Sequence, residues 1–220
     1  MMVGKFSYGR LSLILCLGLL GACQTAIKSE PEPLADGWLN SPSVFATQRD
    51  RLTQLQGWKL TAKVGIKTVS DNESANLIWT VRGTENEIRL YGPLGVGAVR
   101  LSFNGDRAVL KDNKGVEHVG VSPQELLMRV VGWPMPIDSL AYWVFGVPNE
   151  SQSYQYQVFD GRVSLLDQGG WLINYETYKP LFLDDITLPK KITAKRTLLI
   201  NGEESLVRVR LVAKSWTRTR

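Results

Sequence analysis

Apolar and polar residues alternate along much of this 220-residue chain. From Trp58 to Ile66 every second residue is apolar, and most of the residues between them are lysine or threonine. The stretch from Val207 to Ala213 repeats the pattern near the C-terminus. Because successive side chains of a β-strand point to opposite faces, this period of two predicts strands with one buried and one solvated face.

Shorter stretches of the same kind recur between these two. They lie at residues 75–81, 88–90, 99–103, 108–110, 154–159, 162–167, 171–178, 186–188 and 191–200. Asn104-Gly105 and Asn201-Gly202 are typical two-residue hairpin turns, Asp160-Gly161 and Gly169-Gly170 separate further strands, and Asp71 to Ser74 predicts a longer turn. About eleven strands joined by short turns predict an antiparallel meander.

Three segments have a helical pattern instead. Residues 41–56 begin with Ser-Pro and carry apolar residues at helical spacing. Ser122-Pro123-Gln124-Glu125 has the form of a capping box and predicts a helix to about Val131, and a short helix is expected from Ile137 to Phe145. A sheet of one-faced strands needs a cover, which these helices can provide. The predicted fold is mainly β with α, a curved antiparallel sheet or half-open barrel covered by a helical lid.

The most unusual turn lies between the stretches at 88–90 and 99–103. Gly92, Pro93 and Gly95 favour a turn, since glycine permits positive φ and proline fixes φ near about −65°. Turn tips are usually polar, whereas this one carries Leu94 and Val96. Such side chains either fold back onto the core, which is the default, or contact apolar surroundings outside the protein. We favour the second interpretation, which makes Leu94 the candidate contact residue.

The first residues have the pattern of a leader. Lys5 and Arg10 precede an almost wholly apolar run, residues 11–20, which is short for a membrane span. The run ends in Leu20-Gly21-Ala22-Cys23, which resembles a bacterial lipobox, and an ordinary secretory signal with a chance cysteine is the alternative. The resemblance implies that residues 1–22 are a lipoprotein signal peptide and that Cys23 carries an S-diacylglycerol and an N-acyl chain.

The boundaries of the mature chain follow from this leader. Residues 23–37 are polar and contain proline, so we expect a lipidated N-terminus and tether, followed by a single domain at 38–220. Cys16 leaves with the leader, and Cys23 alone allows no internal disulfide. Lipoproteins kept in the inner membrane typically have aspartate after the cysteine. Gln24 therefore implies, by the same resemblance, an outer-membrane protein that faces the periplasm of a Gram-negative bacterium.

Charge and residue types argue against several classes of function. The formal net charge of +5 falls to +3 without Lys5 and Arg10, and the basic residues are spread along the chain, so no nucleic-acid partner is expected. His118 is the single histidine, and a hydrogen-bonded or solvated role is more common for such a residue than catalysis. Asp184 and Asp185 are consecutive, so on a strand they would point to opposite faces. The sequence predicts no enzyme, no metal site and no cofactor other than the covalent lipid.

The apolar faces of the predicted sheet and helices enclose either a filled core or a pocket for an apolar ligand. Aromatic and leucine side chains make up the candidate cavity. They are Trp58, Leu60, Trp79, Leu90, Phe103, Leu126, Leu127, Trp143, Trp171 and Tyr175. For any one of them the sequence favours a core position. Several tryptophans on one sheet favour a cavity with flat walls, because tryptophan fills space less efficiently than leucine or valine, so the sequence leaves both alternatives standing.

Three segments resemble the LolB family of outer-membrane lipoproteins. They are Gly92-Pro93-Leu94-Gly95, VLKDNKG at residues 109–115 and MPIDSLAYWVFGVP at residues 135–148, and the resemblance extends from about Trp38 to Trp216. It implies a half-barrel with a helical lid and a hydrophobic cavity for acyl chains. It also implies a protein that accepts acylated lipoproteins from the periplasmic carrier LolA and inserts them into the outer membrane without nucleotide. Family members need an apolar residue at the tip of a protruding loop for insertion, and that position falls on Leu94.

The partners implied by this resemblance are LolA, acylated lipoprotein cargo and outer-membrane phospholipid, and a monomer is expected. A structural or assembly-scaffold lipoprotein with a filled core is the alternative function. A periplasmic hydrolase is disfavoured, because the sequence shows no nucleophile with an adjacent base.

Overall fold

The computed structural model describes residues 39, 45–53, 55, 57–92, 97–180, 187–200 and 202–219. An antiparallel sheet of 11 strands contains most of them. The strands are β1 (Gly57–Lys67), β2 (Asn72–Arg82), β3 (Glu85–Tyr91), β4 (Val99–Asn104), β5 (Arg107–Lys111), β6 (Glu117–Gly120), β7 (Tyr154–Phe159), β8 (Arg162–Gln168), β9 (Trp171–Pro180), β10 (Thr187–Ile200) and β11 (Glu203–Arg218). The described helices are α1 (Ala46–Thr53), α2 (Pro123–Val131) and α3 (Ile137–Trp143).

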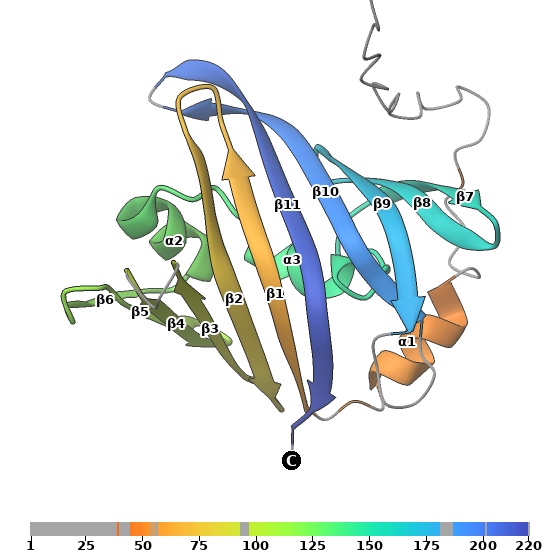
Figure 1. Cartoon of the computed structure of the whole chain (residues 1–220), viewed down its shortest axis with the longest axis horizontal. Coiled ribbons are helices and arrows are strands. Elements are labelled where there is room, and N and C mark those ends of the chain that lie inside the picture. The colour runs from red at the N-terminus through yellow and green to blue at the C-terminus, as the bar shows by residue number, and fades with distance from the viewer. Residues whose placement is uncertain are drawn as a thin grey trace, which may run out of the picture. The chain divides into compact units, whose positions relative to one another are not determined.

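The first and last strands lie side by side at the middle of the sheet. The strand order is β6-β5-β4-β3-β2-β1-β11-β10-β9-β8-β7. Strands β1–β6 and β7–β11 are therefore two meanders, and the antiparallel pairing of β1 with β11 joins them into one sheet. Figure 1 shows α2 and α3 against one face of this sheet, which is called the inner face below. The prediction of a curved antiparallel sheet with a helical cover is confirmed.

Alternation along the strands sorts the side chains between the two faces. In β1, Leu60, Ala62 and Val64 are buried on the inner face, whereas Lys59 and Lys63 are exposed on the outer face. Buried residues of the other long strands join them in one core with the buried residues of α2 and α3. Full burial of an aliphatic side chain contributes about 1.5–3 kcal/mol, so this shared core is the main term that holds the helices on the sheet.

The sequence signals at the two ends of α2 act as predicted. Ser122 is the N-cap, and its hydroxyl accepts a hydrogen bond from the backbone N–H of Glu125 (3.2 Å). The Glu125 carboxylate accepts from Arg129 one turn later (3.3 Å). Gly132 ends the helix at φ 78°, a left-handed conformation that glycine adopts without a Cβ clash. The chain can therefore leave α2 sharply toward α3.

Two turns lie one or more residues away from their predicted positions. The longer turn expected at Asp71 to Ser74 is wrong, because β2 already begins at Asn72 and the connection is 68–71. The hairpin expected at Asn104-Gly105 is shifted by one residue, since Asn104 is the last residue of β4 and pairs with Arg107. Turn residues indicate a reversal of the chain, but the strand register decides which of them belong to the loop.

Other boundaries differ for reasons of backbone geometry. The expected strands at 186–188 and 191–200 are one strand, β10, and Pro189 lies where its register with β9 shifts. Such a bulge tolerates a residue without an amide hydrogen. Helix α1 lies within the predicted segment 41–56 and is described at 46–53, while residues 41–44, 54 and 56 of that segment lie outside the described residues. Helix α3 ends at Trp143 rather than Phe145, because Phe145 N–H and Gly146 N–H bond to carbonyls three residues earlier, which tightens the last turn.

Candidate functional site

The cover of the inner face is called the lid below and consists of α2, the connecting segment 132–136 and α3. Helix α2 packs against β4, β5 and β6. Its Leu126 side chain comes so close to β6 that a Cβ added at Gly120 would lie 3.2 Å from it. Leu127 of α2 and Leu140 of α3 are buried against the sheet. The lid is thus seated on the sheet by side chains that the helical pattern places on one face.

A buried glutamine holds the α3 side of the lid. Gln168, the last residue of β8, accepts hydrogen bonds at Oε1 from the indole N–H of Trp143 (2.9 Å) and from the backbone N–H of Asn149 (2.9 Å). Its Nε2 donates to the Asn149 carbonyl (2.7 Å). Because all these groups are buried, each depends on the glutamine for its hydrogen bond.

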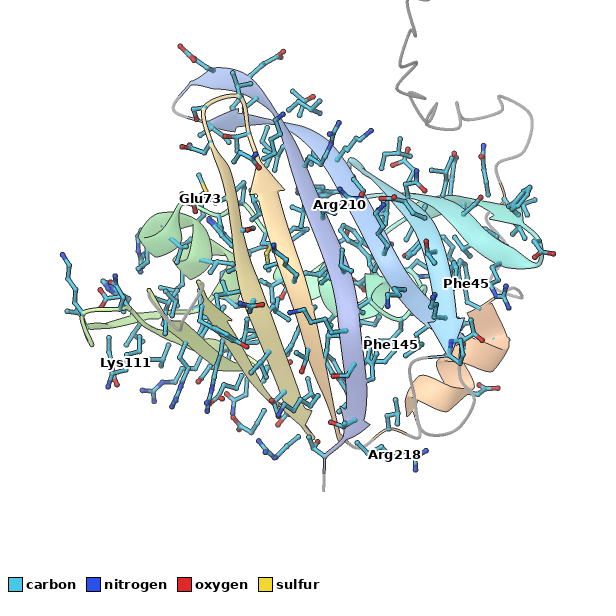
Figure 2. All side chains as sticks on the ribbon, viewed as in Figure 1. Phe45, Glu73, Lys111, Phe145, Arg210 and Arg218 are labelled. Carbon is cyan, nitrogen blue, oxygen red and sulfur yellow. The ribbon has the colours of Figure 1, made fainter. Side chains whose placement is uncertain are left out.

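A hydrogen bond to a carboxylate holds the connecting segment of the lid. The indole N–H of Trp133, in the connecting segment, donates to Glu73 Oε2 at 2.7 Å. Glu73 pairs with Ile66 in the β1–β2 register and so lies on the inner face near the end of the hairpin. Figure 2 shows its side chain beside α2, and the residue is exposed. This carboxylate therefore ties the lid to the central strands at a place that water can reach.

A groove of about 540 Å³ lies between the lid and the strands β9 and β10. Its apolar lining comes from both sides: Met128, Pro134, Met135, Pro136, Trp171 and Leu198. Ligand sites in proteins commonly have 300–1,000 Å³ and a mostly apolar lining with a few polar groups, roughly the character of this groove. It can therefore accept an apolar ligand of moderate size.

Polar groups line the rim of this groove. Arg129 and Glu125 of α2 pair with each other there, and Arg196 of β10 lies on the opposite side. Arg196 pairs with the buried Val207 in the β10–β11 register, so it is on the inner face among apolar residues. It packs over the turn before β9, where a Cβ on Gly170 would lie 3.3 Å from its Nε. The rim thus adds hydrogen-bond donors and acceptors to an apolar floor.

The predicted cavity residues are distributed between this groove and the core. Trp171 lines the groove, and its ring lies 6.3 Å from that of Trp143. Phe103 is half-buried at the margin of the core. The other eight residues of the predicted set are buried in the core, and none of them lines the groove: Trp58, Leu60, Trp79, Leu90, Leu126, Leu127, Trp143 and Tyr175. A cavity lined by these residues stays a prediction.

Four aromatic rings fill the core near the start of β1. Trp58 contacts Trp79, Phe145 and Trp216 with ring centroids 5.4, 5.2 and 5.3 Å apart, and Phe145 contacts Trp216 at 4.6 Å. Asn86 accepts the indole hydrogen bond of Trp79 (3.1 Å). Offset and edge contacts of this kind add about 0.5–1.5 kcal/mol per pair beyond burial. This end of the core is therefore tightly filled.

Tyr175 brings a polar atom into the apolar interior. Its hydroxyl is buried and has no hydrogen-bond partner among the described residues. Burial raises the pKa of this phenol well above its ordinary value. A register shift between β9 and β10 turns Tyr178 to the same side, where its ring lies 5.9 Å from that of Tyr175 and its hydroxyl donates to the Val163 carbonyl (2.8 Å).

Most of the residues that line the groove were not predicted from the sequence. The pattern ended a helix at about Val131, and Met135 and Pro136 entered only through the family resemblance, although Met135 is buried at the floor of the groove. Methionine is flexible and polarizable and recurs at apolar binding surfaces. Met135 between two prolines and the exposed Met128 on α2 were the available signal.

His118 has a local structural contact. Its Nε2 lies 3.1 Å from Asp112 Oδ2, and the hydrogen bond from this histidine holds the pKa of the Asp112 carboxyl below its ordinary value. The other oxygen of Asp112 accepts from the backbone N–H groups of Lys114 and Val116 (both 2.9 Å). The pair therefore closes the turn between β5 and β6.

Several predicted features lie outside the described residues. They are the leader at 1–22, the lipidation residue Cys23, the tether at 24–37, the loop residues Pro93 to Val96, and Asp184-Asp185. Gly92 is described and half-buried just after β3. Within the described ranges, no group of three or more His, Cys, Asp or Glu residues has the arrangement of a metal site. No helix among the same residues is long and apolar enough to cross a membrane.

Comparison with known proteins gives a consistent family. Residues 56–216 match the family model described as outer membrane lipoprotein LolB. The outer-membrane lipoprotein LolB of Pseudomonas fluorescens is 33% identical over 177 residues, which are 80% of this chain and 82% of the relative. The protein of the same name from Nitrosococcus oceani is also 33% identical, over 210 residues that are 94% of this chain and 96% of the relative.

Solved structures give a more distant likeness. A domain of an outer membrane lipoprotein-sorting protein from Vibrio parahaemolyticus aligns with 79% of this chain and 90% of its own. The TM-score is 0.49 and the sequence identity is 9%, which is too distant to support an inference.

Proposed function

The chain belongs to the LolB family of outer-membrane lipoproteins, and on that premise we propose that it accepts triacylated lipoproteins from the periplasmic carrier LolA and inserts them into the inner leaflet of the outer membrane. Membership of the family by itself supports a role in lipoprotein localisation at the outer membrane. The transfer itself is a binding process and includes no nucleotide and no catalytic step.

The apolar groove between the lid and β9–β10 is the observation that carries this proposal. Acyl chains cannot cross water unprotected, and each CH₂ group moved from water into an apolar site contributes about 0.8 kcal/mol. Six apolar side chains line the groove on two sides, so an acyl chain that lies in it contacts apolar surface on both sides. The rim residues Arg129 and Arg196 can donate hydrogen bonds to the ester and amide oxygens at the head of the cargo lipid.

Delivery requires that each successive site bind the acyl chains more tightly. A tenfold preference needs about 1.4 kcal/mol, which is roughly two better-buried CH₂ groups. A groove that is more apolar than the site on LolA would therefore draw the cargo forward, and the bilayer would draw it further. The proposal also includes the expected lipid on Cys23, which keeps the domain beside that bilayer.

The loop with Gly92, Pro93, Leu94, Gly95 and Val96 supplies the contact with the bilayer in this proposal. Burial of one leucine contributes about 1.5–3 kcal/mol, which is small beside a triacyl anchor. Leu94 therefore acts locally, by placing the groove at the membrane surface or by disturbing the lipid packing where the cargo enters.

The test separates acceptance from delivery. Leu94→Glu in the full lipidated chain should still take an acylated lipoprotein from LolA, whereas its release into liposomes should fail. Val116→Glu is the control for an added carboxylate, because Val116 is an exposed apolar residue between β5 and β6. Delivery by the Leu94→Glu variant at the rate of the control would refute the role of the loop.

A scaffold lipoprotein with a filled core is the second candidate function. The tight packing of Trp58, Trp79, Phe145 and Trp216 favours it, since these rings leave one end of the interior occupied. The two candidates differ in cargo binding. Stoichiometric binding of an acylated lipoprotein by the purified protein, with a change in the fluorescence of the groove residue Trp171, supports transfer. No binding under the same conditions supports the scaffold.

A further inference from the structure

Two hairpins meet at one end of the sheet. One is the connection of β1 to β2 at residues 68–71, and the other joins β10 to β11. The backbone N–H of Val69 in the first hairpin donates to the hydroxyl of Ser205 in the second (3.2 Å). Figure 1 shows both tips beyond the ends of the neighbouring strands, at the upper end of the view. These two tips are called the hairpin end below.

The hairpin end carries large apolar side chains in contact with water. Val69 is 80% exposed, Leu199 is 74% exposed and Leu206 is 50% exposed. The turn holds Val69 outward, because Thr68 N–H donates to the Asp71 carbonyl (2.9 Å) and Asp71 N–H donates to Thr68 Oγ1 (3.0 Å). Leu206 precedes the buried Val207, so strand alternation places it on the outer face.

A row of cations crosses the outer face just below these apolar residues. Arg208 of β11 pairs with Lys67 of β1 on one side and with Lys195 of β10 on the other. Like charges directly opposite each other on a sheet are destabilising. Three positive charges at neighbouring positions make the potential of this part of the outer face positive, and such a potential attracts an anionic surface.

The order of the residues along β11 matches the layers of a membrane surface. Leu206 lies two residues from Arg208 toward the tip, a distance of about 7 Å along a strand. Side chains that bind at a bilayer interface bury their apolar part about 5–10 Å deep, and basic residues next to them contact the headgroups. The spacing therefore allows the leucines to reach the acyl region while the cations stay at the phosphates.

Acidic residues at the tip limit the depth of such a contact. Glu203 and Glu204 begin β11, and Asp71 lies in the other turn. Glu204 pairs with Leu199 and is exposed on the same face. A carboxylate is costly in hydrocarbon, so these groups must remain among the headgroups. The contact is thus shallow and uses the side chains that project furthest.

We propose that the hairpin end is a membrane-contact surface that binds the phospholipid of the outer membrane, in addition to the loop around Leu94. Family membership places the chain at that membrane. Antiparallel strands alternate in direction, so β1 ends and β3 ends at the same end of the sheet. β3 therefore runs toward the end that carries the two hairpins and stops at Tyr91, which pairs with Asn76, four residues from the start of β2. In this proposal the loop around Leu94 contacts the same bilayer. Only the shared contact of the hairpin end and the loop around Leu94 with one bilayer rests on the proposed function.

A fluorescent label on the tip tests the inference. The full lipidated chain with Leu199→Cys carries an environment-sensitive fluorophore and is reconstituted into vesicles of phosphatidylethanolamine and phosphatidylglycerol. The emission should shift to the blue and should be quenched by phospholipids spin-labelled near the headgroup. The lipidated chain without the added cysteine, treated identically, corrects for background labelling.

Phe159→Cys is the matched control for this label. Phe159 is 78% exposed at the end of β7, so it is as accessible as Leu199 but lies on an edge strand. A blue shift at position 199 with none at position 159 supports the contact. No shift at position 199, or equal shifts at both positions, would overturn it.

The row of cations gives a second test with the same label. With Arg208→Gln in the labelled chain, quenching should fall on vesicles that contain phosphatidylglycerol. Quenching of the labelled chain that keeps Arg208 should fall as salt is added. If neither the Arg208→Gln substitution nor added salt changes the quenching, the cations do not contribute to the contact. Neither assay contains cargo or LolA, so its failure leaves the transfer proposal untouched, and failure of transfer leaves these results standing.

Discussion

Replacement of Gln168 by methionine should loosen the lid at its α3 side. The two side chains have similar length, so Gln168→Met keeps most of the packing and removes only the polar atoms. Gln168 is 1% exposed and bonds to the Trp143 indole and to both backbone groups of Asn149. Water cannot replace these bonds readily, because Trp143 and Asn149 are buried as well.

The loss in the free energy of unfolding can be estimated from the groups that are left without hydrogen-bond partners. Three buried groups lose their bonds: the indole N–H of Trp143 and the N–H and C=O of Asn149. Each such group costs about 1–3 kcal/mol, and neighbouring terms do not add fully, so the free energy of unfolding should fall by about 3–6 kcal/mol. For a domain of this size, that loss lowers Tm by roughly 6–24 °C.

Urea denaturation followed by tryptophan fluorescence measures this change. Gln155→Met is the control, because Gln155 is exposed on β7 and its replacement should change the stability by no more than about 0.5 kcal/mol. An unchanged denaturant slope would show that both proteins unfold in the same way. A loss for Gln168→Met below about 1 kcal/mol would refute the reasoning, since it would mean that water or a shifted lid satisfies the three groups.

Two further predictions concern the strand β9. Tyr175→Phe removes a hydroxyl without a described partner, so stability should stay unchanged or rise by up to about 1 kcal/mol in urea denaturation, and a loss larger than that would contradict the buried, unbonded position. Burial raises the pKa of the Glu176 carboxyl, but the bonds from Lys191 and Thr193 outweigh it and hold the pKa below its ordinary value. Glu176 should therefore stabilise the fold above the unfolded value of about 4.3 and lose this contribution as the pH falls through its folded pKa. Glu176→Gln should flatten that part of the stability profile, and an unchanged profile would contradict the assignment.

Local signals in the sequence predicted the elements whose causes are local. The alternation in β1 and β11 follows directly from one-sided burial, and the pattern is uninterrupted from Trp58 to Ile66 and from Val207 to Ala213. The start of α2 was predictable because its N-cap residue and first-turn glutamate are only three residues apart in the sequence. The cover of the sheet could be predicted as well, since the apolar faces had to be buried against something.

Features that depend on strand register were not predictable from the pattern. The pattern predicted separate strands on the two sides of Pro189, but a bulge lets β10 continue through it. A second register shift, between Lys191 and Ile192, turns Tyr178 to the inner side, whereas strict alternation would place it opposite to Tyr175. A period-two pattern assigns faces only where the ladder is regular, so a single bulge reverses the assignment beyond it.

The groove was harder to predict than the core for a related reason. Trp171 was named from the sequence, but Met128 and Leu198 join it only because α2 and β10 are brought together by the fold. Leucine and tryptophan line filled cores and cavities alike, so residue type could not separate the two. The tight cluster around Trp58 and the groove beside Trp171 show both outcomes in one domain.

The unequal attachment of the lid indicates how the groove would widen in the proposed transfer. The α3 side is held by three bonds among buried groups, whereas the connecting segment is held by one bond from Trp133 to an exposed carboxylate. A hydrogen bond to a charged group contributes about 1.5–3 kcal/mol, which burial of two to four CH₂ groups would offset. The groove adjoins this segment, so an entering acyl chain can offset the loss of that bond and replace the apolar contacts of the buried Trp133 and Met135 as this side of the lid lifts. No nucleotide is needed for such a step, because the ligand that requires the opening also drives it.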